Sequence, residues 1–365
     1  MQCITDTDLS GASSLMQRKR QDIKTDMFPT GYLQTGQLTC HDVSGQKISC
    51  PGSGQDAAFS TGIPWPSPRF LADENSVQDH LTGLIWTRDA NIAEFPMTWQ
   101  EALEWVHRMN LEQAFGFSDW RLPNRRELRS LVSHQTRRPA LPENHPFVNV
   151  FLSWYWTSTT AAIASDHAWY VSMDGARMFY GGKDQSFMVW PVRGRAATLP
   201  VTGQTLCYDA HGTVIPCRET GQDAAFHTGM PWPDSRFLID TNSIVDQLTG
   251  LRWLRHADLT AGAVSWPDAL AAIEALCRDD PELRWRLPNI NEFESLIDCA
   301  RHSPALPLGH AFTHLNEAYW SSTTSLFEPD WAWALYLNKG AIGVGQKSGA
   351  HYRVWAVADA ATSSS

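Results

Sequence analysis

Two pairs of cysteines with identical spacing offer the clearest chemistry in the sequence. Nine residues separate Cys40 from Cys50, and nine residues separate Cys207 from Cys217. A Ser44-Gly45 turn between the first two cysteines predicts a β-hairpin, and thiols on paired strands can face each other. We therefore expect a disulfide in each pair rather than free thiols. Zinc is a weaker alternative, because each pair supplies only two ligands.

Three further cysteines have less regular surroundings. Cys277 and Cys299 are expected at the ends of two helices in the second half of the chain, where a third disulfide can form. The corresponding residues of the first half, Asn110 and His134, cannot make one. Cys3 has no counterpart with which to pair, so its state stays open.

Other reactive side chains do not form a catalytic or metal-binding pattern. Glu127, a candidate acid or base, follows Asn124 by three residues, which is the spacing of a helix capping box. His310 and His314 have the i, i+4 spacing of metal ligands, but the first half of the chain has Asn149 at the second position. We therefore expect no metal, no cofactor and no enzymatic activity.

All of these residues belong to a unit that occurs twice. Gly54–Phe59 recurs as Gly221–Phe226, and Trp120–Asn124 recurs as Trp285–Asn289. In each copy, capping spacings predict two helices, and a later set of strands follows them, which is an α+β arrangement. The predicted organisation is a polar N-terminal segment that can be disordered (1–30), a first unit (31–195), a second unit (196–358) and a flexible tail (359–365).

Charge and hydropathy argue against two classes of partner. The formal net charge of −10 argues against nucleic acids and anionic membranes, which require clustered Lys and Arg. No apolar run approaches the roughly 18 residues that a membrane-spanning helix needs. The 17 Trp and 24 Gly residues favour compact domains with aromatic cores and many tight turns.

The expected location depends on the cysteines. The first thirty residues contain no apolar stretch that could serve as the core of a signal peptide. Disulfides, however, persist in oxidising compartments. We therefore expect an extracellular, periplasmic or cell-surface protein, and whether an export signal has been removed stays open.

The candidate ligand-binding residues lie in one segment of each copy, between a predicted hairpin turn and the closing strand. The residues that frame this segment recur, but its contents differ between the copies. A rigid scaffold with a variable loop is typical of binding proteins, and the alternative is a solvent-exposed loop that diverged after duplication. The candidates are Arg177, Tyr180, Lys183, Asp184 and Gln185 in the first copy and Gln346, Lys347, His351 and Tyr352 in the second.

The ordered motifs of the repeat resemble the Lcl C-terminal domain family. They include Trp120–Asn124, Tyr155-Trp156 and Val189–Arg193, and the resemblance covers about residues 79–195 and 246–357. The Trp-Arg-Leu-Pro element is also similar to that of formylglycine-generating-enzyme-type domains. The resemblance implies two tandem C-type-lectin-like domains, each with two helices and a small, mainly antiparallel sheet, and each preceded by a disulfide-linked hairpin.

The resemblance also implies a surface-exposed or secreted bacterial domain, since adhesion to glycans or host surfaces is described for the namesake of the family. We therefore expect a non-enzymatic binding or adhesion protein that recognises a glycan or a protein surface through variable loops. One alternative is a structural subunit of a surface assembly that self-associates. A second is an enzyme of unknown reaction.

Overall fold

A computed structural model of the chain describes residues 31–360. The predicted N-terminal segment 1–30, Cys3 and most of the predicted tail lie outside the described residues. Within them, no helix is long and apolar enough to cross a membrane.

The two repeats have the same order of strands and α-helices, and the first has in addition one 3₁₀ helix. The first half of the chain contains β1 (Cys40–His41), β2 (Lys47–Ile48), α1 (Asp56–Phe59), β3 (Phe70–Ala72), β4 (Ser76–Asp79), β5 (Ile85–Thr87), α2 (Trp99–Leu111), the 3₁₀ helix η1 (Ala114–Gly116), α3 (Arg125–Ser130), β6 (Trp154–Thr160), β7 (His167–Ser172), β8 (Met178–Gly182) and β9 (Val192–Arg193). The second half contains β10 (Cys207–Tyr208), β11 (Val214–Ile215), α4 (Asp223–Phe226), β12 (Phe237–Asp240), β13 (Ser243–Asp246), β14 (Leu251–Leu254), α5 (Trp266–Asp279), α6 (Ile290–Leu296), β15 (Ala318–Thr324), β16 (Trp331–Tyr336), β17 (Ala341–Gln346) and β18 (Val357–Asp359).

The helices begin where the capping residues predict. Asn124 and Asn289 form capping boxes with the glutamates three residues later, at the start of α3 and α6. Thr98 does the same for α2, and the side chain of Ser265 accepts a hydrogen bond from a backbone N–H of α5. The long helices α2 and α5 bury one apolar face each. These local predictions are confirmed.

A single six-stranded antiparallel sheet connects the two repeats. Its order is β15-β16-β17-β8-β7-β6, so the strands of one repeat continue into those of the other. The join is the pairing of Met178 in β8 with Ile342 in β17. The same offset of 164 residues relates Met178 to Ile342 and Trp156 to Trp320, so equivalent positions meet at a pseudo-twofold axis.

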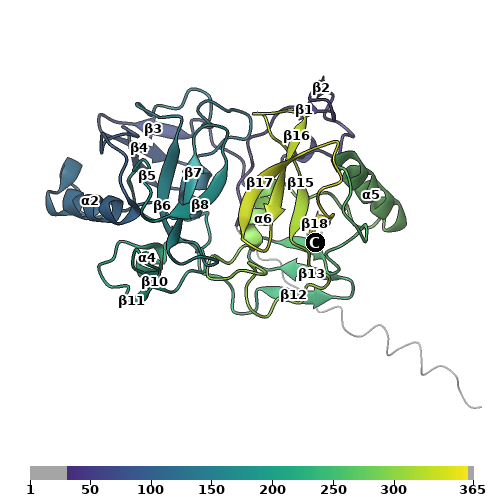
Figure 1. The fold of residues 1–365 in the computed structure, drawn as a ribbon. Coiled ribbons are helices and arrows are strands. Elements are labelled where there is room, and N and C mark those ends of the chain that lie inside the picture. The colour runs from purple at the N-terminus through teal and green to yellow at the C-terminus, as the bar shows by residue number, and fades with distance from the viewer. Residues whose placement is uncertain (1–30, 361–365) are drawn as a thin grey trace, which may run out of the picture.

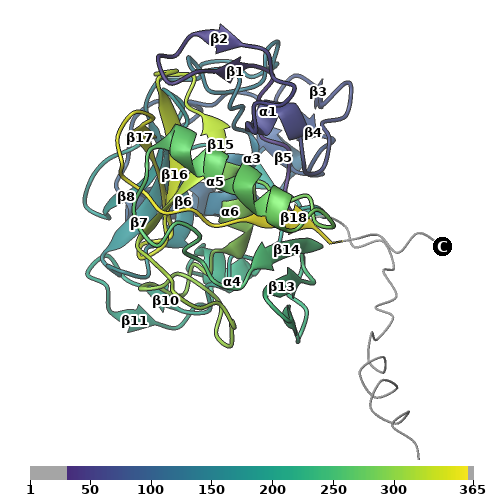
Figure 2. The ribbon, with the colours of Figure 1, turned by 90° about the vertical axis from the view of Figure 1, so that its right-hand side faces the viewer.

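Two smaller sheets complete the repeats. The first has the order β3-β4-β5-β9 and the second β12-β13-β14-β18. In Figure 2, α3 and α6 lie to the right of β8 and β17, and α3 contacts β6 and β7 whereas α6 contacts β15 and β16. Tryptophan pairs fill the two cores: Trp86 packs edge-on against Trp190, and Trp253 packs against Trp355. The chain is thus two tandem regions of mixed α/β structure with several small antiparallel sheets.

The hairpin of each repeat packs on the other repeat. The side-chain amide of Gln37, in the segment before β1, donates to the backbone oxygen of Thr324 in β15, 2.8 Å away. In the reciprocal arrangement, the amide of Gln204, before β10, donates to the backbone oxygen of Thr160 in β6 at 2.8 Å. Figure 1 shows β1 and β2 above β16 and α5, and β10 and β11 below β6 and α2. Each hairpin therefore belongs to one repeat in the sequence but packs against the other repeat in the structure.

The two hairpin disulfides are confirmed, and the third predicted disulfide is wrong. Cys40 bonds to Cys50 and Cys207 to Cys217, with Cα–Cα distances of 5.3 and 5.2 Å. Cys277 and Cys299 are free. They lie in separate apolar cores, where the thiol of Cys277 donates to the backbone oxygen of its neighbour Trp285 at 3.0 Å.

The free cysteines differ in exposure, which predicts their reactivity. Cys299 is 3 % exposed, and burial raises the pKa of its thiol to about 12, so it should resist a thiol reagent in the folded protein. In a Cys3→Ser variant, we expect one slowly reacting thiol, Cys277, under native conditions and two after denaturation without reductant. Four reactive thiols after denaturation would contradict one of the hairpin disulfides.

Candidate functional site

A groove on the outer face of the central sheet crosses from one repeat to the other. It encloses about 660 Å³ and lies over the join between β8 and β17. Its walls carry aromatic and charged side chains from both repeats. The lining residues are Trp154, Tyr170, Arg177, Met178, Phe179, Glu328, Trp331, Tyr336, Lys339, Ile342, Gly343 and Val344. We call this surface the sheet groove.

The first repeat supplies three aromatic rings, one exposed and two partly buried. Phe179 is 39 % exposed, and its ring stacks on that of Tyr180, with centroids 4.9 Å apart and an angle of 8°. Tyr170 packs edge-on against Trp154 at 4.5 Å. Because each ring is held by another ring, the groove is a preformed aromatic surface rather than a set of mobile side chains.

The second repeat supplies paired hydroxyl groups. The hydroxyls of Tyr336 and Tyr352 are hydrogen-bonded at 2.7 Å, and that of Tyr352 also donates to the backbone oxygen of Val344 at 3.2 Å. Burial, followed by the contact with Tyr336, raises the pKa of Tyr352. The phenol of Tyr352 therefore remains protonated near neutral pH.

Charged groups form the rim of the groove. The guanidinium of Arg177 lies 3.4 Å from the carboxylate of Glu328 in the other repeat, and both side chains are more than two-fifths exposed. The ammonium of Lys339 lies 5.8 Å from the ring centroid of Phe179. Such exposed ion pairs add little stability, so these groups can exchange partners with a ligand.

The predicted ligand residues separate into different environments. Arg177 lines the sheet groove, and Tyr180 and Tyr352 contact residues that line it. The exposed residues Asp184, Gln185, Gln346 and His351 are not part of its lining.

Sequence reasoning missed the aromatic residues on the strands. One signal was present, since Trp169 recurs as Trp333, whereas its neighbour Tyr170 is replaced by Ala334. Successive residues of a strand point to opposite faces, so a residue that differs between the copies beside a recurring core residue indicates the outer face of the strand.

Contrary to what the sequence led us to expect, Lys347 does not lie in an exposed loop. Its side chain is fully buried, because the hairpin of the other repeat covers it. The ammonium donates to the backbone oxygens of His41 at 3.0 Å and Asp42 at 3.2 Å, and it lies 4.4 Å from the ring centroid of Trp266. Lys347 therefore attaches the β1–β2 hairpin to the second repeat.

Lys183 makes the equivalent contacts in the first repeat, so it does not lie in an exposed loop either. It is 1 % exposed and donates to the backbone oxygens of Tyr208 and Asp209 in the hairpin β10–β11, at 3.4 and 3.0 Å. Burial lowers the pKa of Lys183 to about 8 and that of Lys347 to about 7.

A buried aspartate anchors the short helix of each hairpin segment. Asp56 of α1 accepts hydrogen bonds from the hydroxyls of Thr35 and Thr323, both at 2.7 Å, and thereby links the first segment to β15. Asp223 of α4 is held in the same way by Thr159 of β6. Burial raises the pKa of both carboxyls to about 6, although the hydroxyl donors partly offset this effect.

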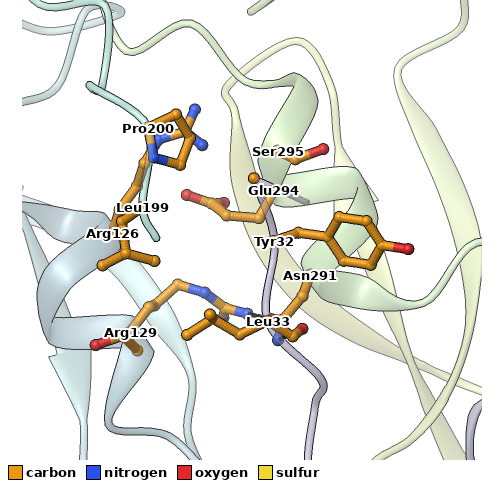
Figure 3. Close-up of a pocket in the computed structure, with 11 residues that line it drawn as sticks. Tyr32, Leu33, Arg126, Arg129, Leu199, Pro200, Asn291, Glu294 and Ser295 are labelled. Atoms are coloured by element: carbon orange, nitrogen blue, oxygen red, sulfur yellow. Dashed lines mark hydrogen bonds between the residues drawn. The ribbon is translucent and has the colours of Figure 1, made fainter. Parts of the chain in front are cut away.

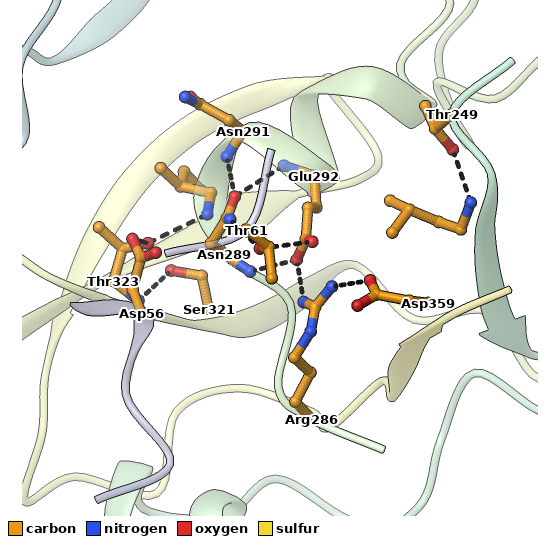
Figure 4. Close-up of polar contacts among 12 residues, drawn as sticks. Asp56, Thr61, Thr249, Arg286, Asn289, Asn291, Glu292, Ser321, Thr323 and Asp359 are labelled. Carbon is orange, nitrogen blue, oxygen red and sulfur yellow. Dashed lines mark hydrogen bonds and ion pairs between the residues drawn. The ribbon is translucent and has the colours of Figure 1, made fainter. Parts of the chain in front are cut away.

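The Trp-Arg-Leu-Pro-Asn element serves the same contact between repeats. The carboxylate of Glu292 accepts from Arg286 and from the hydroxyl of Thr61, which belongs to the other repeat (Figure 4). The amide of Asn289 donates to the same hydroxyl at 3.0 Å. Because Glu292 is buried with its oxygens already bonded, its position favours a structural role over acid–base chemistry.

Two equivalent clefts flank the molecule where the hairpin segments meet the long helices. The cleft between α2 and α4 encloses about 660 Å³, and the cleft between α5 and α1 about 560 Å³. The recurring pairs Leu103 and Leu270, and Phe226 and Phe59, line them. Both phenylalanines are 46 % exposed. The clefts are second candidates for ligand binding.

No group of three or more His, Cys, Asp or Glu side chains converges within residues 31–360 in a way that could hold a metal ion. His314 stacks on His256, with centroids 3.9 Å apart, and does not pair with His310.

Sequence comparison identifies a known domain in both repeats. A family model described as the Lcl C-terminal domain matches residues 75–193 and 242–358, which together make up more than half of the chain. Both matched regions include the strands of the sheet groove, whereas the two disulfide-linked hairpins lie outside them. No curated protein matches the chain.

Removal of the Lys347 ammonium should weaken the attachment of the hairpin. Lys347→Met leaves two backbone oxygens without their donor, so we expect a loss of about 1–3 kcal/mol in the free energy of unfolding, measured with urea. Lys47→Met, at an exposed position of the same hairpin, should change it by less than about 0.5 kcal/mol. Equal effects of the two variants would contradict the role of Lys347.

The buried carboxyls of Asp56 and Asp223 predict a dependence of stability on pH. Their folded-state pKa of about 6 exceeds the value of about 3.9 in an unfolded chain. The folded state therefore binds protons more tightly, and wild type gains stability as the pH falls through this window. We expect its advantage in unfolding free energy over the Asp56→Asn, Asp223→Asn variant to grow from about pH 6 to about pH 4. A constant difference would mean that both carboxyls stay ionised.

Proposed function

Because the chain belongs to the Lcl C-terminal domain family, with two tandem copies, we propose that it is a non-enzymatic binding protein whose ligand-binding surface is the sheet groove. The observation that carries this proposal is the gathering of aromatic rings from both repeats into one preformed groove with a charged rim. Concave sites with rigid aromatic walls and a few polar groups are typical of ligand binding.

The proposed ligand is a glycan. The exposed ring of Phe179 and the partly buried ring of Tyr170 offer flat apolar faces against which the C–H faces of sugar rings can stack. Arg177 and Glu328 can bond to hydroxyl groups at the rim. A groove open along its length suits a chain of sugars. Since both repeats contribute, the ligand bridges the two repeats in a composite site.

We assign each repeat a C-type-lectin-like fold. The two helices, the antiparallel strands and the Trp-Arg-Leu-Pro element before α3 and α6 support this assignment, together with the similarity of that element to formylglycine-generating-enzyme-type domains. Fold alone does not define a ligand. The glycan proposal therefore depends on the groove, and the lectin-like fold is consistent with it.

An extracellular, periplasmic or cell-surface location completes the proposal. Two disulfides, one in each hairpin, support an oxidising compartment.

Phe179→Ala tests the proposal directly. A glycan array probed with the wild-type protein should identify bound glycans, and titration calorimetry with the best of them should show at least a tenfold loss of affinity for the variant, because a stacking face is removed. Phe226→Ala removes a ring of similar exposure, 46 % against 39 %, in a flanking cleft and should bind as wild type does.

Three outcomes would contradict the proposal. If the wild-type protein binds no glycan on the array, the glycans of that array are excluded as ligands. Equal affinities of wild type and Phe179→Ala exclude the groove as the site. A wild-type dimer that Phe179→Ala converts to a monomer, measured by light scattering, would instead make the groove a surface for self-association.

A further inference from the structure

The repeats differ in charge at the contact between α3 and α6. The offset of 165 residues that relates Asn124 to Asn289 pairs Arg126 with Asn291 and Arg129 with Glu294. Helix α3 therefore brings three buried arginines to the join between the repeats, and α6 brings Glu294. The other buried glutamates of the two helices, Glu127 and Glu292, form ion pairs with Arg121 and Arg286. Positive charge exceeds negative charge in this interior.

One of the three arginines is compensated. The guanidinium of Arg125 forms two hydrogen bonds with the carboxylate of Glu294, at 3.1 and 2.7 Å, and a third with the backbone oxygen of Gly340 at 2.8 Å. It also lies over the ring of Trp169, 4.1 Å from the centroid. The carboxylate of Glu294 is thus already engaged.

The other two arginines keep unsatisfied donors. Arg126 is 4 % exposed and Arg129 is 6 % exposed, and within residues 31–360 neither forms an ion pair. Arg126 donates to the backbone oxygen of Ile297, and Arg129 donates to the side-chain oxygen of Asn291 at 2.8 Å. The Nε–H of Arg126 and one terminal N–H group of Arg129 have no partner in this part of the chain.

Neighbouring carboxylates do not supply the missing charge. Asp79 and Asp246 are buried in ion pairs with Arg69 and Arg236. Asp298 is near enough to Arg126 for the guanidinium to lower its pKa, but burial has the larger effect and raises it. An uncompensated buried charge is costly, because it loses its hydration without gaining a partner.

Arg126 and Arg129 line a small cavity between the repeats. Its volume is about 40 Å³, which exceeds the roughly 10–15 Å³ that one water needs. Figure 3 shows these arginines on one side and Asn291, Glu294 and Ser295 on the other. Leu33, from the segment before β1, and Pro200, from the connection between the repeats, add apolar surface to its lining.

We propose that this cavity binds a small monovalent anion of halide size between Arg126 and Arg129. The anion accepts hydrogen bonds from the two guanidinium N–H groups that have no partner. Its negative charge offsets the positive charge of the arginines, which the surrounding side chains do not balance. It contacts α3, α6 and both hairpin segments at once, so it stabilises the contact between the repeats. The site is independent of the sheet groove, which lies on the opposite face of the central sheet.

Thermal unfolding of the full chain tests the proposal. Chloride should raise the melting temperature by about 2–5 °C when it replaces gluconate, an anion too large for the cavity, at constant ionic strength. The Arg126→Met, Arg129→Met variant should lose this response. Arg218→Met, at an arginine that is 89 % exposed, should keep it, which controls for general charge effects.

A crystallographic measurement remains decisive if the double variant does not fold. Crystals of the wild-type protein grown in bromide should show an anomalous peak in the cavity, within about 3.5 Å of both guanidinium groups. Ordered water without an anomalous peak, or a melting temperature that is equal in chloride and gluconate, would overturn the proposal.

Discussion

The structure depends on the exchange of hairpin segments between the two repeats. Asp56, Lys347 and Thr61 each form buried polar contacts with groups of the opposite repeat, and equivalent contacts recur on the other side of the pseudo-twofold axis. A buried polar group that lacks its partner destabilises the folded state. Neither repeat has its buried polar groups satisfied by its own sequence unit alone, so the two must fold as one body.

This exchange fixes the position of the candidate binding surfaces. The pairing of β8 with β17 is short, and a groove built on that pairing alone could open like a hinge. The exchanged segments hold the two halves of the sheet from both sides, because each is attached to β6 or β15 by an aspartate and a glutamine. The flanking clefts exist only because α1 and α4 lie against the long helices of the opposite repeats.

Local features were predictable from the sequence, whereas the partner of each hairpin was not. Capping residues such as Asn124 act on the next few backbone N–H groups, and Cys40 and Cys50 face each other across one turn, so short-range patterns were sufficient. The exchange joins groups such as Asp56 and Thr323, which are 267 residues apart. Because Thr159 recurs as Thr323, the sequence does not distinguish which of the two threonines donates a hydrogen bond to Asp56.

The unexpected burial of two predicted site residues has the same cause. Lys183 and Lys347 stand in glycine-rich segments that are typical of exposed loops, and only the hairpin of the other repeat buries them. Their recurrence was informative, since a residue retained in both copies of a duplicated chain favours a role that both copies share. The residues that differ, such as Phe179 and Arg177, lie in the sheet groove.

Pseudo-symmetry explains why divergence concentrates at the join. Side chains near a twofold axis meet their own equivalents, so an arginine retained in both copies would face a second arginine in a buried space. The second copy instead has Glu294 where the first has Arg129, and the carboxylate of Glu294 pairs with Arg125. It also has the neutral Asn291 where the first copy has Arg126. The two copies are therefore an asymmetric pair at this contact, and the excess of positive charge there distinguishes the interior of this interface from an ordinary apolar contact.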